Sequence, residues 1–302
     1  MDDVPDLGPV PRRRTVGVAL VRRLIGEQFP RWAGLPVRPV SHGGWDNFTF
    51  HVGDGMVARL PSAAEYALAV EKEQRWLPVL ASRLPLPVPV PLAQGKPGAG
   101  YPFPWSIHSW LDGETASPDR IADPVRFAVD LAGFLAALQD VEAAGGPRPG
   151  KHNWFRGATL RTYEPSAERA LAALDGRIDA GLAREIWTTA LAARWDGRDV
   201  WFHGDVAAGN LLLDGGALTA VIDFGTCGVG DPACDTAIAW TLLTAEGRRA
   251  FRERLSVDDE TWARGRGWAL WKTLVSAART GEEAEEAHRV LGEILAEYPT
   301  GR

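Results

Sequence analysis

The 302-residue sequence contains few cysteines, no excess of basic residues and no long apolar run, and each of these absences excludes a class of protein. The two cysteines, Cys227 and Cys234, are too few for the disulfide framework of a small secreted domain. Both are close to a cluster of polar residues, and a small buried apolar side chain is the simplest interpretation of each.

Acidic residues outnumber basic ones, with 39 Asp and Glu against 33 Lys and Arg, so the formal net charge is −6. A general nucleic-acid binder needs a basic face that releases phosphate counterions, and this function is therefore not expected. No apolar stretch reaches the roughly 20 residues that span a bilayer, and the N-terminus lacks a signal-peptide segment. A cytoplasmic enzyme or binding protein without a membrane partner is expected, and a cationic substrate would suit the mild acidity.

Tryptophan is abundant, with 13 residues, and the chain is longer than a typical single domain. This length favours two lobes, each large enough to bury its own core. Several tryptophans lie in apolar contexts in which large rings usually serve packing. These are Trp201, Trp240, Trp268 and Trp271.

The N-terminal third is predicted to be rich in β-structure. Residues 1–14 are proline-punctuated and without periodicity, which indicates a flexible tail. Alternating apolar positions, glycine turns and proline-rich stretches indicate the elements that follow. In chain order we expect a helix after Thr15, a hairpin of strands 47–52 and 56–60, a helix over 63–80, an extended stretch over 84–105 and a strand over 106–111.

After Gly113 the apolar spacing becomes helical. We expect helical stretches over 125–139, 164–194, 232–254 and 259–296. The fold class predicted is therefore α+β and bilobal. A β-rich N-terminal lobe covers residues 15–110, and a mainly helical C-terminal lobe covers residues 111–302.

Four polar side chains stand directly at the ends of apolar runs in residues 201–225. The runs 211–213 and 218–222 are joined by Asp-Gly-Gly-Ala, which predicts an antiparallel hairpin. If Leu213 faces about residue 220, Asn210 lies opposite Asp223, with Cβ atoms about 5 Å apart. An amide oxygen and a carboxylate are suitable ligands for Mg²⁺, which takes its other ligands from water and substrate phosphates.

Asp205 precedes Asn210 by five residues and can reach the same cavity from the preceding loop. It could orient a substrate hydroxyl and accept its proton. Taken singly, each of these residues has a simpler interpretation as a turn or cap residue, and His203 as a loop histidine with satisfied hydrogen bonds. Their joint pattern favours the functional interpretation.

The run His203-Gly204-Asp205, with Asn210 five residues later and Asp223-Phe224-Gly225 beyond it, resembles the kinase catalytic loop and metal-binding triplet. Gly204 stands where kinases usually have Arg. With this glycine and the run GDPACD at 230–235, the chain is similar to the aminoglycoside phosphotransferase family, a branch of the protein-kinase-like fold. The order of the two lobes extends the resemblance to nearly the whole chain.

The resemblance implies a role for each of these residues. Asp205 would be the catalytic base, and Asn210 and Asp223 would hold Mg²⁺ on the nucleotide phosphates. Asp235 would support the catalytic loop together with His203. An acid favoured by the dipole at a helix N-terminus accounts equally well for Asp235.

The small lobe should then bind the nucleotide. The segment 41–47 resembles the phosphate-covering loop of the family, although it has only two glycines, and its expected binding residues are Ser41, Gly43, Gly44 and Asn47. Arg59 stands where kinases place a phosphate-binding Lys, and it retains the charge. Its expected helix partner is Glu73, with Glu71 as the alternative.

Counting back from Asp112-Gly113 places the adenine-binding hinge at residues 109–111. By the resemblance, backbone groups of Ser109 and Leu111 contact the base. His108 stands where a residue that controls access behind the base is expected.

The implied activity is transfer of the γ-phosphoryl group from ATP or GTP to a hydroxyl of a small molecule. An aminoglycoside-like antibiotic or amino-sugar is the first acceptor to consider, and a sugar, amino-alcohol or other metabolite is the alternative. A nucleotide-binding pseudokinase that acts as an interaction module is a second hypothesis. Four acidic residues of the large lobe are candidates for contacting a polyamine, although a solvated surface explains each more simply: Glu114, Asp258, Asp259 and Glu260.

Overall fold

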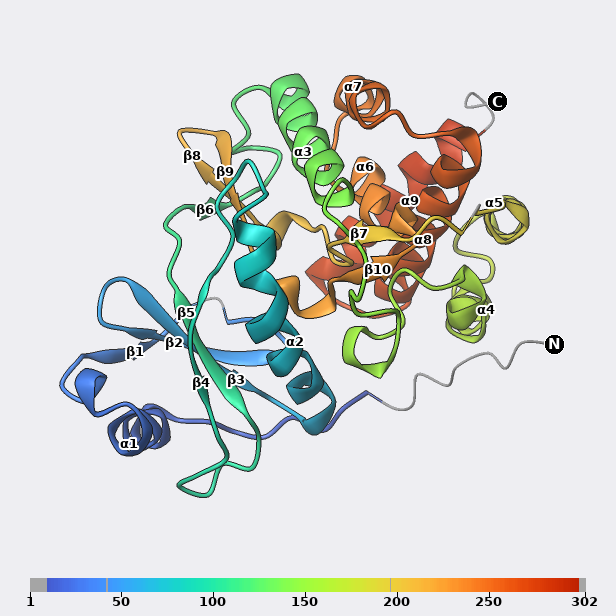
Figure 1. Ribbon diagram of the computed structural model, residues 1–302. Coiled ribbons are helices and arrows are strands. Elements are labelled where there is room, and N and C mark those ends of the chain that lie inside the picture. The colour runs from blue at the N-terminus through green and yellow to red at the C-terminus, as the bar shows by residue number, and fades with distance from the viewer. Residues whose placement is uncertain (1–9, 42, 196, 299–302) are drawn as a thin grey trace.

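The computed structural model describes residues 10–41, 43–195 and 197–298. The chain forms a small lobe built on a β-sheet and a larger lobe built mostly of helices (Figure 1). The predicted bilobal α+β fold is therefore confirmed. Within the described ranges, no helix combines the length and the apolar character needed to cross a membrane.

The small lobe contains one antiparallel sheet. Its strands are β1 (Val37–Pro39), β2 (Asn47–Val52), β3 (Met56–Pro61), β4 (Pro91–Gly95) and β5 (Trp105–Ser109), which pair in the order β1-β2-β3-β5-β4. The predicted hairpin is present as β2 and β3. The strand expected over 106–111 ends at Ser109 instead, because the chain leaves the sheet there to enter the large lobe.

The helix α1 (Val18–Gln28) packs on this sheet. Val21, Leu24 and Ile25 occur at helical spacing and are fully buried in the same apolar core as Phe50. Because this core is separate from that of the large lobe, the small lobe has its own apolar stabilisation.

The segment before α1 is tied to the small lobe. The backbone N–H of Arg14 donates to the carbonyl of Ser62 at 2.9 Å, and the guanidinium of Arg13 lies over the ring of Trp45. The expected flexible tail over 1–14 therefore does not describe Arg13 and Arg14. Residues 1–9 of that tail lie outside the described residues.

The helix α2 (Ala64–Ala81) lies between the two lobes (Figure 1). Its C-terminal residues Leu77 and Leu80 are buried in the core of the large lobe. The helix therefore packs on the large lobe although it precedes residue 110. The lobe division at residue 110 stays a prediction.

The large lobe contains α3 (Pro124–Gln139), α4 (Glu164–Ala173), α5 (Ala180–Ala192), α6 (Ile238–Thr241), α7 (Ala245–Leu255), α8 (Asp259–Ala277) and α9 (Glu282–Glu297). Every helical stretch predicted beyond residue 160 is interrupted. Gly176 and Gly281 have φ angles of +71° and +99° at two of these breaks, positive values that glycine adopts more readily than other residues. The stretch 232–254 begins with the 3-10 helix η6 (Pro232–Ala237).

Short strands lie at the border with the small lobe. They are β7 (Val200–Phe202) paired with β10 (Gly228–Gly230), and the hairpin of β8 (Leu211–Asp214) and β9 (Ala217–Val221), with β6 (Glu114–Thr115) beside β8. The tryptophans expected in the core are buried at positions 201, 240 and 268, whereas Trp271 is half-buried. Cys227 and Cys234 are free and buried, as expected.

The predicted hairpin is present, but its predicted register is wrong. Leu213 pairs with Leu218 rather than residue 220, because the turn consists of two residues and the register shifts after Leu212. The turn residues Gly215 and Gly216 both have positive φ, as a two-residue type I′ turn requires.

Candidate active site

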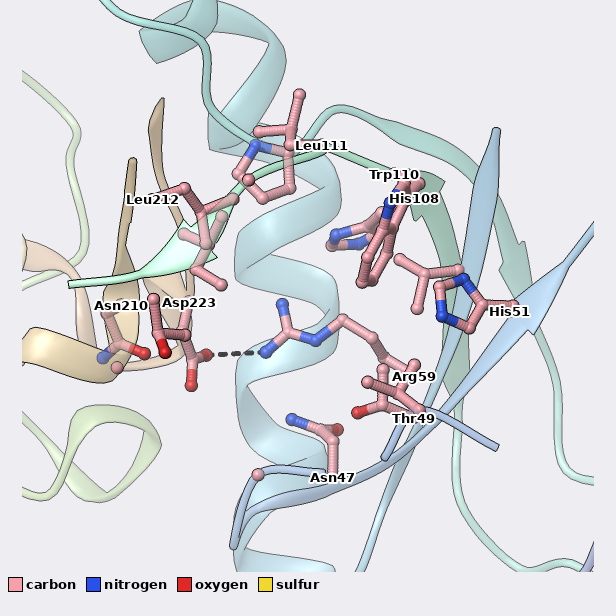
Figure 2. A pocket seen from close by; sticks show the side chains of 18 of the residues that line it. Asn47, Thr49, His51, Arg59, His108, Trp110, Leu111, Asn210, Leu212 and Asp223 are labelled. Atoms are coloured by element: carbon pink, nitrogen blue, oxygen red, sulfur yellow. Dashed lines mark hydrogen bonds and ion pairs between the residues drawn. The ribbon is translucent and has the colours of Figure 1, made fainter. Parts of the chain in front are cut away.

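A cleft of about 590 Å³ lies between the small-lobe sheet and the β8–β9 hairpin (Figure 2). Gly43, Glu73 and Asp205 lie outside its lining. The lining includes these residues predicted from the sequence: Ser41, Gly44, Asn47, Arg59, Ser109, Leu111, Asn210 and Asp223. The structure therefore brings the expected phosphate loop, hinge and metal ligands to one cavity.

Arg59 links the two lobes across this cleft. Its Nη1 lies 2.8 Å from Oε1 of Glu73, and its Nη2 lies 2.7 Å from Oδ1 of Asp223, the contact drawn in Figure 2. Glu71 is exposed on α2, so Glu73 is the helix partner of Arg59. Burial opposes the charge on Arg59, but the two carboxylates outweigh burial and raise the pKa of Arg59 above its ordinary value.

Glu73 is almost completely buried, and burial raises its pKa even though Arg59 favours the ionised form. Its neighbour Lys72 is also buried and donates to the carbonyls of Gly225 and Cys227 at 2.7 and 2.9 Å. Two consecutive residues of α2 therefore hold both Arg59 and the chain around Asp223. Sequence reasoning missed Lys72, because nothing in a helical pattern indicates that a lysine is buried.

His203 braces the loop that carries Asp205. Its Nε2 lies 3.0 Å from the carbonyl of Ile222, and its Nδ1 lies 3.2 Å from the backbone nitrogen of Asp205. Since the Asp205 N–H must donate, Nδ1 is the acceptor and Nε2 carries the proton. The ring also contacts Phe224 edge-on. His203 therefore joins the loop to the segment before Asp223.

Asp235 fixes the backbone of the same loop. Its two carboxylate oxygens accept the backbone N–H groups of His203 and Gly204, both at 2.7 Å, and it is fully buried. Gly204 has a φ of +86°, and a Cβ there would lie 2.6 Å from the carbonyl oxygen of Thr226. A larger residue such as the Arg of kinases would not fit at this position.

The carboxylate of Asp205 is held by side chains from two elements. Nζ of Lys272 on α8 lies 2.6 Å from its Oδ1, and Nδ2 of Asn210 donates to its Oδ2 at 3.3 Å and to the backbone carbonyl of Asp205 at 2.9 Å. Burial opposes the charge of Asp205, but Lys272 and Arg156 outweigh it and hold its pKa well below the usual range. The carboxylate is therefore ionised at neutral pH.

Sequence reasoning also missed Lys272 and Arg156. Lys272 lies 67 positions from Asp205, and its only signal is that it stands alone as a cation in the apolar second half of α8. Arg156 donates from Nε to the carbonyl of Gly204 at 3.1 Å and from Nη1 to the hydroxyl of Tyr163 at 2.6 Å.

Asn210 and Asp223 lie side by side at the cleft wall (Figure 2). Asn210 is opposite Ile222, whose N–H it accepts at 2.9 Å, so Asp223 follows one residue later than the predicted register placed it. Because Nδ2 of Asn210 faces Asp205, its amide oxygen is available on the other side. The described residues contain no cluster of three or more His, Cys, Asp and Glu that could hold a metal alone. The two oxygen donors fit Mg²⁺ that takes its remaining ligands from phosphate and water.

Two N–H groups of the expected hinge at residues 109–111 are already paired within the protein, and contact of Ser109 and Leu111 with a base stays a prediction. The N–H of Ser109 already donates to the carbonyl of Val90, and the N–H of Trp110 donates to Gly55. Of its two backbone groups, Ser109 can therefore offer only the carbonyl to a base. The ring nitrogens of His108 have no partner among the described residues, and burial together with the charge of Arg59 lowers the pKa of His108 to about 3.

Asp46 is a further carboxylate in the cleft lining. Burial and the carboxylates of Asp223 and Asp205 raise the pKa of Asp46 to about 7. Asp46 belongs to the segment 41–47 that was expected to cover the phosphates, but nothing in the sequence indicated a role for this carboxylate.

Comparisons with known proteins concern the family and the fold of the chain. The model of the phosphotransferase enzyme family matches residues 36–268. No curated protein matches the sequence significantly. Three solved structures illustrate the similarity in fold, and their low sequence identities limit the likeness to the fold.

The GDP complex of wild-type aminoglycoside 2'-phosphotransferase-IIIa has a TM-score of 0.69 and 19% identity, covering 93% of this chain and 99% of that chain. The GDP and kanamycin complex of APH(2")-IIia has a TM-score of 0.70 and 21% identity, covering 92% of this chain and 99% of that chain. The apoenzyme of macrolide 2'-phosphotransferase MphH from Brachybacterium faecium has a TM-score of 0.57 and 20% identity, covering 93% of both chains. Because the family model spans most of its length, this chain belongs to the phosphotransferase enzyme family.

Proposed function

We propose that this protein transfers the γ-phosphoryl group of ATP or GTP, with Mg²⁺, to a hydroxyl group of a small molecule. The observation that carries the proposal is the loop from His203 to Asn210. It holds an ionised carboxylate, Asp205, beside the cleft that contains Asn210, Asp223 and Arg59. Similar folds were solved with GDP, or with GDP and kanamycin, which supports a purine nucleotide as the phosphoryl donor.

Each side chain has a separate part in this proposal. Asp205 accepts a hydrogen bond from the acceptor hydroxyl and takes its proton as the oxygen attacks the γ-phosphorus. The bond from that phosphorus to the β,γ-bridging oxygen breaks, and ADP or GDP leaves. Because its pKa is low, Asp205 acts mainly by orienting the hydroxyl, which is what phosphoryl transfer requires. Arg59 binds phosphate oxygens, and Asn210 and Asp223 would hold Mg²⁺, which would neutralise charge on the phosphates when bound. Ser41, Gly43, Gly44 and Asn47 cover the phosphates.

The acceptor is a small molecule with a free hydroxyl. Relatives in fold are named for aminoglycosides and for macrolides, so an aminoglycoside-like antibiotic or amino-sugar is the first candidate. A sugar, an amino-alcohol or another metabolite is the alternative.

A nucleotide-binding pseudokinase is the second candidate function, suggested by Arg59 at the usual lysine position and by the two-glycine loop. Arg59 forms ion pairs with both Glu73 and Asp223. Arginine in place of the usual lysine therefore keeps the contacts between the lobes. This favours an enzyme.

Two substitutions test the assignment. Asp205→Asn should lower turnover by about 10²–10⁴-fold with little change in nucleotide affinity, because the residue faces the acceptor. Asp223→Asn should weaken binding of the Mg-nucleotide. Transfer of labelled γ-phosphate to a panel of hydroxyl compounds and titration with a fluorescent nucleotide measure the two effects.

Asp214→Asn is the matched control, since Asp214 is an exposed carboxylate near the hairpin turn. Near wild-type turnover of the Asp205→Asn variant would show that the base is misassigned. Tight nucleotide binding by the wild type without transfer to any compound would favour the pseudokinase.

A further inference from the structure

The charges around Asp205 point to the chemical class of the acceptor. We propose that the acceptor carries an oxyanion group, such as a carboxylate, close to the hydroxyl that receives the phosphoryl group, and that Lys272 recognises this group. The inference rests on the proposed function, in which Asp205 binds the hydroxyl.

Lys272 is placed so that any acceptor must come close to it. Its Nζ lies 2.6 Å from Oδ1 of Asp205. A hydroxyl bound to that oxygen at ~3 Å therefore lies within about 6 Å of the ammonium. The Lys272 and Asp205 side chains are 26% and 38% exposed, so both can be reached from solvent. Lys272 has three N–H donors, and its bond to Asp205 uses one of them.

Arg156 adds a second fixed cation. Its guanidinium lies over the ring of Trp271 at 4.8 Å and is fixed by its hydrogen bonds to Gly204 and Tyr163. It is close enough to Asp205 to lower the pKa of that carboxyl. Two cations therefore lie beside Asp205. Lys272 also interacts with Asp235, but that carboxylate is fully buried and both of its oxygens already accept backbone N–H groups.

Asp46 and the acids at the start of α8 are further negative charges that could attract an amine. Asp46 interacts with Asp205, but its pKa of about 7 leaves it only partly charged at neutral pH. Asp258, Asp259 and Glu260 lie at the start of α8, and Lys272 is about 20 Å further along the helix at ~1.5 Å per residue. These three acids, which were considered as contacts for a polyamine, are therefore far from the reacting hydroxyl.

The consequence for substrate choice is electrostatic. An amine next to the reacting hydroxyl would bring a second positive charge close to Lys272 in a partly buried site, where repulsion is weakly screened. An oxyanion at the same place would pair with the ammonium. On this inference, the site favours hydroxy acids or sugar acids, which belong to the alternative class of metabolite acceptors in the proposed function, over polycationic aminoglycosides.

Matched acceptors test the inference. One set is glucuronate, glucose and glucosamine, and the other is glycerate, glycerol and aminopropanediol. For each compound, kcat/KM is measured with Mg-ATP and with Mg-GTP, and binding to the protein is measured by calorimetry whether or not phosphate is transferred. The wild type should favour the acid over the amine by about tenfold or more in at least one set.

Lys272→Glu should reverse this preference, and Lys272→Met should remove it, while nucleotide affinity stays the same in both variants. Lys96→Glu is the control, because Lys96 is an exposed lysine of the small lobe. Lys272, in contrast, lies on α8 of the large lobe. A wild type that prefers amines, or a Lys272→Glu variant with an unchanged preference, would overturn the inference while phosphate transfer would still support the proposed function. Absence of both transfer and binding for every compound of the two sets would overturn the inference, whereas the proposed function is overturned only if the wider panel of hydroxyl compounds also receives no phosphate.

Discussion

Asp46 lies in the cleft near two other carboxylates, Asp223 and Asp205. Burial and these two negative charges raise its pKa to about 7, from an ordinary value of 3.8. An acid whose pKa is higher in the folded state binds its proton more tightly there. Its stabilising contribution is complete below pH ~4 and is lost as the pH rises through about 7.

Asp46→Asn removes this titration. At pH 8 the free energy of unfolding should be higher for the variant than for the wild type, because the wild type then carries the unfavourable charge. At pH 4 the difference should disappear. Urea unfolding at both pH values, without nucleotide and with a chelator present, measures the change. A difference that is the same at pH 4 and pH 8 would contradict the raised pKa.

At the scale of elements, α8 and η6 pack so closely that only glycine fits between them. A Cβ at Gly265 would lie 1.7 Å from Oγ1 of Thr236, a buried side chain of η6. The short helix η6 also carries Asp235, which accepts a backbone N–H of the loop that contains Asp205. The position of the loop therefore depends on how closely α8 approaches η6.

Gly265→Ala should destabilise the protein by about 1–3 kcal/mol and lower turnover, because α8 and η6 must move apart. Gly292→Ala is the matched control: Gly292 is exposed within α9, and a Cβ there meets nothing within 4 Å. Since alanine is the better helix former, Gly292→Ala should stabilise by up to about 1 kcal/mol. Denaturant unfolding of both variants measures the contrast, and equal stability would show that the contact is not tight.

At the scale of the whole molecule, the two lobes have separate apolar cores and meet through α2 and Arg59. Lys72 adds two hydrogen bonds across this border, to the carbonyls of Gly225 and Cys227. These carbonyls flank the triplet that contains Asp223. The lysine thus couples the position of α2 to the expected metal ligand.

Lys72→Met keeps the length of the side chain and removes the donor. Two carbonyls then lose their partner, and we expect a loss of stability of about 1–3 kcal/mol together with weaker Mg-nucleotide binding. Thermal unfolding and nucleotide titration measure both effects. Lys96→Met, on the exposed surface of the small lobe, should change neither. If Lys72→Met bound nucleotide as tightly as the wild type, the coupling through Lys72 would be absent.

Much of the candidate site could be predicted from short stretches of sequence. The hairpin after Asn210, the partner of Arg59 and the order of the lobes all depend on local periodicity or on spacing that a known motif fixes. The register of the hairpin could not be predicted, because a two-residue glycine turn and a bulge change the pairing without changing the apolar pattern.

The sequence alone determined which chemical groups are present in the loop and triplet, and that they lie at the ends of apolar strands. The tertiary structure alone decided which charges surround them. Lys272 and Arg156 reach Asp205 from separate parts of the chain, and Lys72 reaches the triplet over more than 150 positions. Such contacts depend on how helices pack against one another, and packing leaves no periodic signal at the positions that meet.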